Sequence, residues 1–144
     1  MAWRSSSVPL NESLLPFVVQ EHHEGTAVHW DLMLHRPGKI KKNENEKILA
    51  VWKLSVCPVP EKLNHPLSIT ALPDHRKAYL TYEGPISQNR GWCKIFDRGD
   101  YELVESRPDF WRVRFAGKHL SGRFVLQKID GPDTWTLTKA EPTG

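Results

Sequence analysis

The sequence predicts an all-β, mainly antiparallel protein, and three observations favour this class. Short β-prone runs recur along the chain with turn residues between them. Residues 111–115 read Trp-Arg-Val-Arg-Phe, an alternation of apolar and charged side chains that is typical of a half-buried strand. No segment has a convincing helical period, and only Pro60–His65 is expected to form a helical turn. Many short strands joined by regular turns indicate an antiparallel barrel or sandwich.

The predicted strands are rich in β-branched and aromatic residues, and Gly, Pro, Asp and Asn mark the bends between them. The expected bends are Arg36-Pro37-Gly38, Asp97-Arg98-Gly99-Asp100, Leu120-Ser121-Gly122 and Asp130-Gly131-Pro132-Asp133. The mixed-charge run from Lys39 to Lys47 is expected to be a solvated loop. The expected strands are Phe17–His22, Val28–His35, Lys47–Val56, Lys77–Glu83, Trp92–Asp97, Tyr101–Glu105, Phe110–Phe115, Arg123–Ile129 and Thr134–Lys139.

Length and composition predict a single folded domain. The chain has 144 residues, of which 39% are hydrophobic and 26% charged. Residues 1–15 are polar and without periodicity, so we expect a flexible N-terminal arm followed by one domain at 16–144. No apolar run is long enough to span a membrane, and residues 1–7 lack the apolar stretch of a secretion signal, so a cytoplasmic location is expected. The net charge of +3 permits nucleic-acid binding without requiring it.

The tryptophans and cysteines have structural roles as their simplest interpretation. Trp52, Trp92, Trp111 and Trp135 lie in strand-like runs and are expected to build the core. The two cysteines, Cys57 and Cys93, form no CxxC motif, so we expect buried free thiols rather than a disulfide framework or a zinc finger.

Residues 20–31 concentrate the side chains that carry chemistry. They read Gln-Glu-His-His-Glu-Gly-Thr-Ala-Val-His-Trp-Asp, and apolar β-prone residues precede and follow them. We expect two antiparallel strands with a short loop, in which Gln20 and His22 share one face of the first strand and His29 and Asp31 share one face of the second. The hairpin can then bring His22, His29 and Asp31 together. Two imidazoles and a carboxylate form a compact divalent-metal triad.

A second informative stretch follows at residues 72–85. His75 comes after a turn, and Tyr79 lies four residues later. An imidazole and a phenol can both contact a phosphate oxygen, and either can transfer a proton. An alternative chemistry uses His29 and Asp31 with a distant histidine, either His119 or His75, as the iron ligands of a non-haem oxygenase. That alternative leaves the histidine pair at 22 and 23 without a role.

Taken together, these stretches resemble the 3′-phosphoesterase domain of bacterial DNA ligase D. Residues 17–22 followed by His-Trp-Asp at 29–31 resemble its opening motif, and stand-alone relatives share the wording His-Trp-Asp-Leu-Met-Leu at 29–34. His75 and Tyr79, followed by the pair Glu83-Gly84, fit its second motif. Residues 96–102 resemble its Trp-Asp-Arg-Gly hairpin, and residues 120–126 and 135–139 resemble its closing strands. The resemblance runs in one order from about residue 16 to residue 139.

The resemblance implies a compact, closed or nearly closed β-barrel with few short helices. It also implies a manganese-dependent phosphoesterase that processes 3′ ends of DNA or RNA in end repair, as a diesterase and then a monoesterase. The ion is expected to be Mn²⁺, with Co²⁺ and Zn²⁺ as alternatives. The expected partners are nucleic-acid 3′ ends and a separate ligase or polymerase, with no membrane partner, and the protein is expected to be a monomer. The implied roles are metal binding by His22, His29 and Asp31, phosphate chemistry by His75 and Tyr79, and substrate binding by Gln20.

The sequence departs from the family pattern at two points. Five residues usually separate the two metal histidines, which favours His23, whereas strand alternation with Gln20 favours His22 as the ligand. The family's phosphate-binding arginine, two residues after the aspartate, is Met33 here. Arg76 is the substitute we expect to bind substrate, with Arg36 and Arg90 as alternatives. Because of Met33, a module that binds nucleic-acid ends without cleaving them is the alternative function, and a small-molecule phosphoesterase is a third.

Overall fold

The protein is all-β. The computed structural model describes residues 14–38 and 43–140, so the predicted arm lies outside the described residues apart from Leu14 and Leu15, which begin the first strand. Short 3₁₀ turns, η1 (Pro60–Lys62) and η2 (Lys77–Leu80), are the helical elements of this part of the chain. The strands are β1 (Leu14–Glu24), β2 (Ala27–His35), β3 (Lys47–Leu54), β4 (Leu67–Arg76), β5 (Gly84–Pro85), β6 (Trp92–Arg107), β7 (Phe110–Gly117), β8 (Ser121–Asp130) and β9 (Thr134–Lys139).

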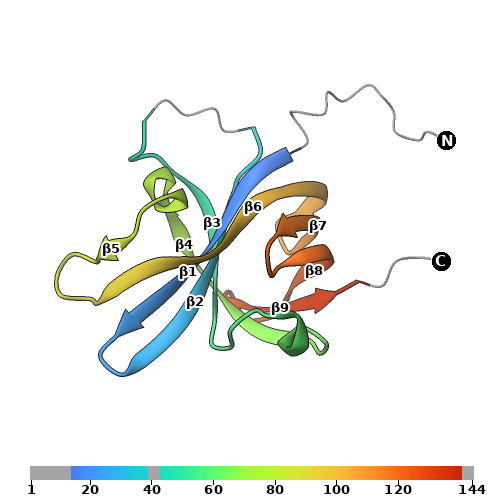
Figure 1. Cartoon of the computed structure of the whole chain (residues 1–144). Helices are drawn as coiled ribbons and strands as arrows, with labels where there is room; N and C mark the ends of the chain where they lie inside the picture. Colours follow the sequence, from blue (N-terminus) through green and yellow to red (C-terminus); the bar gives the residue numbers. More distant parts are fainter. Residues whose placement is uncertain (1–13, 39–42, 141–144) are drawn as a thin grey trace.

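Eight antiparallel strands close into a barrel (Figure 1). The order around the sheet is β1-β2-β3-β4-β9-β8-β7-β6, and β6 pairs with β1 to complete the circle. Closure leaves no free strand edge in the barrel wall. The short β5 pairs with β6 next to the barrel. The predicted all-β, antiparallel, closed barrel is therefore confirmed.

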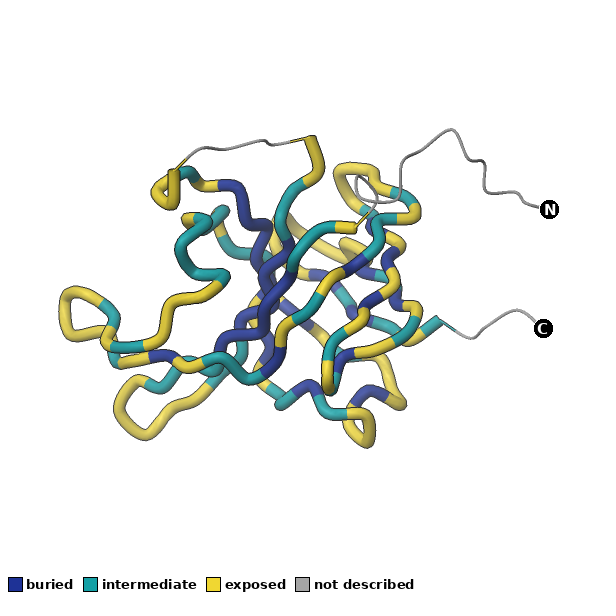
Figure 2. Tube along the Cα trace, turned by 45° about the horizontal axis from the view of Figure 1, so that its top comes forward, coloured by how far each residue is buried: buried dark blue, intermediate teal, exposed yellow. Residues whose placement is uncertain are grey.

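The barrel interior is filled by side chains that alternate along each strand. On β7, Trp111, Val113 and Phe115 are buried while Arg112 and Arg114 are exposed, as the sequence alternation predicted. The rings of Trp111 and Trp135 both pack edge-on against Trp52. Figure 2 shows the buried residues concentrated along the strands and the exposed ones at their connections. Three of the four predicted core tryptophans are therefore confirmed.

A second apolar cluster lies on the outer face of the barrel wall. It contains Val18, Met33, Ile48, Leu49 and Val51, and Tyr79 and Leu80 pack against it. This cluster explains why consecutive residues of β1 and β2 are buried. One face of each strand points into the barrel, and the other is covered by the segment that contains Tyr79 and Leu80. We call residues 77–91, which comprise η2, β5 and the loop after β5, the strap.

The prediction of a strand at Lys77–Glu83 is wrong. The segment forms η2 and a turn, and the strand lies earlier, at β4. The backbone N–H groups of Lys77 and Ala78 donate to the carbonyls of Glu46 and Glu44, which draws the segment away from a strand path. The apolar Tyr79 and Leu80 favoured a strand in the sequence, but they are half-buried and pack against the outer cluster instead.

The turn predicted at residues 97–100 is also wrong, because β6 runs unbroken from Trp92 to Arg107. A β-bulge at Phe96 interrupts its register with β1 instead. The buried carboxylate of Asp97 accepts hydrogen bonds from the backbone N–H groups of residues 98, 118, 119 and 120. Asp97 therefore organises the β7–β8 turn rather than a turn of its own.

Other predictions have mixed outcomes. Trp92 is 44% exposed and stacks on His23, so its predicted core position is wrong. Both cysteines are free, as predicted, but only Cys93 is buried and Cys57 is partly exposed. The helical turn expected at Pro60–His65 is present as η1. In the described part of the chain, no helix is long and apolar enough to cross a membrane.

Candidate metal centre

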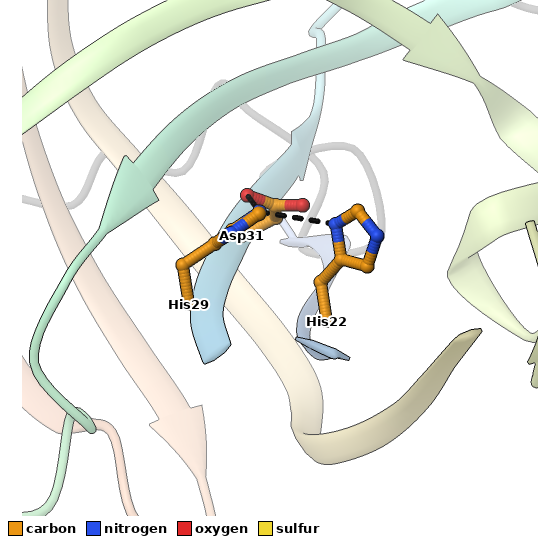
Figure 3. A group of neighbouring side chains, drawn as sticks. All are labelled: His22, His29 and Asp31. Carbon is orange, nitrogen blue, oxygen red and sulfur yellow. Dashed lines mark hydrogen bonds and ion pairs between the residues drawn. The ribbon is translucent and has the colours of Figure 1, made fainter. Parts of the chain in front are cut away.

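The hairpin of β1 and β2 brings the predicted triad together on the outer face of the barrel. Gly25, with φ +63°, makes the bend between the two strands. In the resulting register His22 lies directly opposite His29, and Gln20 opposite Asp31. The Nδ1 atom of His22 lies 3.1 Å from Nε2 of His29, which in turn lies 3.2 Å from Oδ1 of Asp31. Figure 3 shows the three side chains converging from the paired strands.

The ring of His22 is oriented by the strap. Its Nε2 atom lies 2.8 Å from the carbonyl oxygen of Arg90. A carbonyl only accepts hydrogen bonds, so this nitrogen carries a proton and donates it. In the neutral ring, the lone pair then resides on Nδ1, the atom that faces His29. A histidine ligand commonly has this arrangement, in which one nitrogen binds the metal and the other donates to a carbonyl.

The three donor atoms fit a divalent ion. One ligand atom from each of His22, His29 and Asp31 lies within 4.8 Å of the others. Asp31 is only 6% exposed, and apart from the 3.2 Å ion-pair contact with Nε2 of His29, its Oδ1 atom has no hydrogen-bond partner. A buried carboxylate oxygen without such a partner is costly unless a cation compensates it. Two imidazoles and one carboxylate suit Mn²⁺, Co²⁺ or Zn²⁺.

The other candidate histidines lie elsewhere. His23 points to the opposite face of β1, where it contacts Glu21 and stacks on Trp92. Strand alternation, which favoured His22, therefore identifies the residue that faces His29. The five-residue spacing, which favoured His23, does not. His119 stacks on Phe96 and does not belong to the group His22, His29 and Asp31, the candidate metal ligands among the described residues.

A cavity of about 290 Å³ adjoins the triad and gathers the second set of predicted residues. His75 and Tyr79 lie side by side in its wall, with ring centroids 5.8 Å apart. The Nδ1–H of His75 donates to the carbonyl of Pro73, which leaves the Nε2 lone pair available. The guanidinium of Arg76 lies over the Tyr79 ring at 5.5 Å. The complete lining is Gln20, His22, Asp31, Met33, Lys47, Asp74, His75, Arg76, Tyr79, Ile86, Ser87, Arg90 and Cys93.

Gln20 anchors the strap. Its Nε2 atom donates to the carbonyls of Tyr79 and Tyr82, at 2.9 and 2.7 Å. Its Oε1 atom is buried and has no hydrogen-bond partner. The side chain predicted to bind substrate therefore holds Tyr79 in place with one end, and only its oxygen is left for a ligand.

Three arginines were candidates for the phosphate-binding role that Met33 cannot fill, and the structure places them in two different cavities. Arg36 forms a two-point ion pair with Asp74, at 2.7 and 3.0 Å, and lines a different cavity of about 330 Å³ at the barrel mouth. No histidine or carboxylate lines that cavity. Arg76 and Arg90 both line the cavity beside the triad. Met33 itself is 2% exposed and belongs to the outer apolar cluster.

Lys47 and Cys93 are among the residues of this cavity that sequence reasoning missed. Cys93 lies opposite His22 in the pairing of β1 with β6. Burial raises the pKa of the Cys93 thiol, so it stays protonated and acts as an apolar wall. Only the pairing of β1 with β6, two strands that are far apart in the sequence, places it here, and no local pattern signals such pairing.

The chain was compared with protein-family models and with curated proteins, and neither comparison found a match.

Proposed function

We propose that this protein is a divalent-metal-dependent phosphoesterase that acts on the 3′ ends of nucleic acid. The observation that carries the proposal is the convergence of two residue sets on one cavity. The metal-binding group His22, His29 and Asp31 adjoins a wall that contains His75 and Tyr79. Phosphoryl chemistry needs charge neutralisation on one side of the phosphate and hydrogen-bond donors or acids on the other.

An ion held by the triad would supply Lewis-acid stabilisation for the negative charge that builds on a phosphate ester. The protein's own groups do the rest. The phenol of Tyr79 donates a hydrogen bond to a phosphate oxygen, and its neighbour His75 holds or transfers a proton through Nε2. The cationic side chains of Lys47, Arg76 and Arg90 in the cavity wall favour an anionic substrate.

The choice of 3′ ends and of manganese is supported by the resemblance of the sequence motifs to the ligase D phosphoesterase domain. The cavity volume of about 290 Å³ suits a terminal nucleotide phosphate better than a long duplex segment. The cytoplasmic location, the monomeric state and a separate ligase or polymerase partner stay predictions.

The test measures inorganic phosphate released from a 3′-phosphorylated oligonucleotide in the presence of Mn²⁺, Co²⁺ or Zn²⁺. We expect metal-dependent release, which His29→Ala abolishes because a ligand is lost. We expect His75→Ala to lower release by about 10²-fold, the usual contribution of a positioned acid or base, while metal binding is retained. An absence of release with all three ions would overturn the catalytic proposal.

A second candidate function is binding of nucleic-acid ends without cleavage, and Met33 is the observation that favours it. This position carries a buried apolar side chain and no phosphate-binding cation. The same assay separates the two functions when it is combined with fluorescence-anisotropy binding. Tight binding of a 3′-phosphorylated end without phosphate release favours the binding module, and release favours the enzyme. Competition by mononucleotides would indicate a small-molecule phosphoesterase instead.

A further inference from the structure

Arg90, in the loop from Ile86 to Gly91, reaches the candidate site in two ways. The backbone carbonyl of Arg90 accepts the hydrogen bond from Nε2 of His22, at 2.8 Å. The same residue lines the cavity where a phosphate would lie. Its guanidinium donates through Nε to the carbonyl of Ser87 and through Nη2 to the Ser87 hydroxyl, at 3.0 and 3.4 Å. Three of its five N–H groups are then left for an anion.

Backbone contacts close the loop and connect it to β1. The backbone N–H of Ile86 donates to the carbonyl of Gly91 and closes it. Gln88 and Asn89 both adopt left-handed φ values, +62° and +58°. Gly91 has φ +90°, and a Cβ atom there would lie 1.8 Å from the carbonyl oxygen of His23, the neighbour of the metal ligand. The loop therefore cannot shift without changing its contact with β1.

We propose that Arg90 couples the two halves of the site: its carbonyl orients His22 for the metal ion, and its guanidinium binds the substrate phosphate. This inference rests on the proposed function. A phosphate bound by the guanidinium holds the loop, and the held loop keeps the His22 ring in its metal-binding orientation. By linkage, each ligand then raises the affinity for the other, and coupling of this kind is typically about 5- to 150-fold.

The test measures Mn²⁺ affinity by calorimetry with and without inorganic phosphate. Arg90→Ala removes the guanidinium and keeps the carbonyl. We expect Mn²⁺ affinity without phosphate to be almost unchanged, and the increase caused by phosphate to fall by about tenfold. Arg76→Ala is the matched control, because it removes an equal charge from the same cavity but lies outside the loop. It should weaken phosphate binding and retain more of the coupling, and equal coupling in the two variants would overturn the inference.

A second variant tests the carbonyl contact. Gly91→Ala changes no group of the site but forces the loop away from β1. We expect its Mn²⁺ affinity without phosphate to fall by about tenfold, as for other losses of a partner that orients a metal ligand. Gly122→Ala is the matched control, since Gly122 has φ +103°, no atom within 4 Å of an added Cβ, and a place on β8, which does not line the cavity. Thermal melting verifies that both variants fold.

The outcomes separate this inference from the proposed function. If the unaltered protein binds Mn²⁺ and releases phosphate while Gly91→Ala behaves like Gly122→Ala, only the role of the loop is overturned. If the unaltered protein binds no Mn²⁺, the proposed function and the inference are both overturned.

Discussion

At the scale of single residues, His22 and His23 show how position decides chemistry. The two side chains are identical and adjacent, yet successive residues of a strand point to opposite faces. His22 therefore faces His29, and His23 stacks on Trp92. The same alternation places Gln20 on the face of His22, where its amide nitrogen holds the strap.

Tyr101 is a residue whose pKa is shifted mainly by burial. Its side chain is fully buried, and its hydroxyl donates to the carbonyl of His35 at 2.6 Å. Burial raises the pKa of Tyr101 well above its usual value. The folded state therefore prefers the neutral phenol, while the unfolded chain ionises near its ordinary pKa of about 10. The stability that this preference contributes is complete below about pH 10 and decreases as the pH rises above that value.

Tyr101→Phe tests this argument. At pH 7 we expect the substitution to cost about 1 kcal/mol of unfolding free energy, because the His35 carbonyl loses its donor. Between pH 7 and pH 11 the unaltered protein should lose about 1.4 kcal/mol more than the variant, since only its unfolded state gains from ionisation of this phenol. Urea unfolding at the two pH values measures both quantities. An equal loss in the two proteins would contradict the burial argument.

At the scale of elements, the strap is the part that turns a barrel wall into a site. It brings Tyr79 and Arg90 over the outer face of β1 and β2, close to the triad. Gln20 fastens it by two hydrogen bonds, and the carboxylate of Glu83 accepts a third from the backbone N–H of Ile95 beside the β6 bulge. The outer apolar cluster beneath it supplies hydrophobic contact.

Gln20→Glu should loosen the strap. The substitution replaces a donor with a carboxylate that faces two carbonyl oxygens, and all three are acceptors. We expect a loss of about 3 kcal/mol in unfolding free energy at pH 7 and faster proteolysis within residues 77–91. Gln20→Leu is the control, because it removes the donor without adding a charge and should cost less. Unfolding curves as stable as those of the unaltered protein would show that Gln20 does not fasten the strap.

At the scale of the whole molecule, the apolar core that stabilises the fold and the candidate metal centre lie in different places. The barrel interior is apolar and contains the packed cluster of Trp52, Trp111 and Trp135. The triad lies outside this core, on the opposite face of the β1–β2 hairpin. A metal-free protein should therefore stay folded, with the ion adding to its stability and not creating it.

Thermal and urea unfolding with chelator and with Mn²⁺ test this separation. We expect the chelated protein to unfold in one cooperative transition. Mn²⁺ at 100 times its dissociation constant should add about 2.7 kcal/mol to the unfolding free energy. His29→Ala should retain the fold and lose this increment, because one ligand is missing. A chelated protein that is unfolded at the outset would mean that the ion is part of the folding core.

The sequence predicted much of the fold, and two of its errors in secondary structure share one cause. Alternation identified β7 and the positions of the triad, and turn chemistry identified the bend at Gly131. The prediction failed at residues 77–83 and 97–100, where distant contacts override local preference. The backbone carbonyls of Glu46 and Glu44 accept the hydrogen bonds that begin η2. The Asp97 carboxylate accepts hydrogen bonds from the backbone N–H groups of the β7–β8 turn.

The sequence by itself determined the β class and the juxtaposition of His22, His29 and Asp31, because side-chain alternation and hairpin pairing act between residues close in the chain. Only the tertiary structure decided that the strap lies over this face, that Arg90 orients His22 and that Arg36 lies elsewhere. Those contacts join residues far apart in sequence, such as Gln20 and Tyr82, which are separated by 62 positions. Their formation depends on closure of the whole barrel, and no local pattern encodes it.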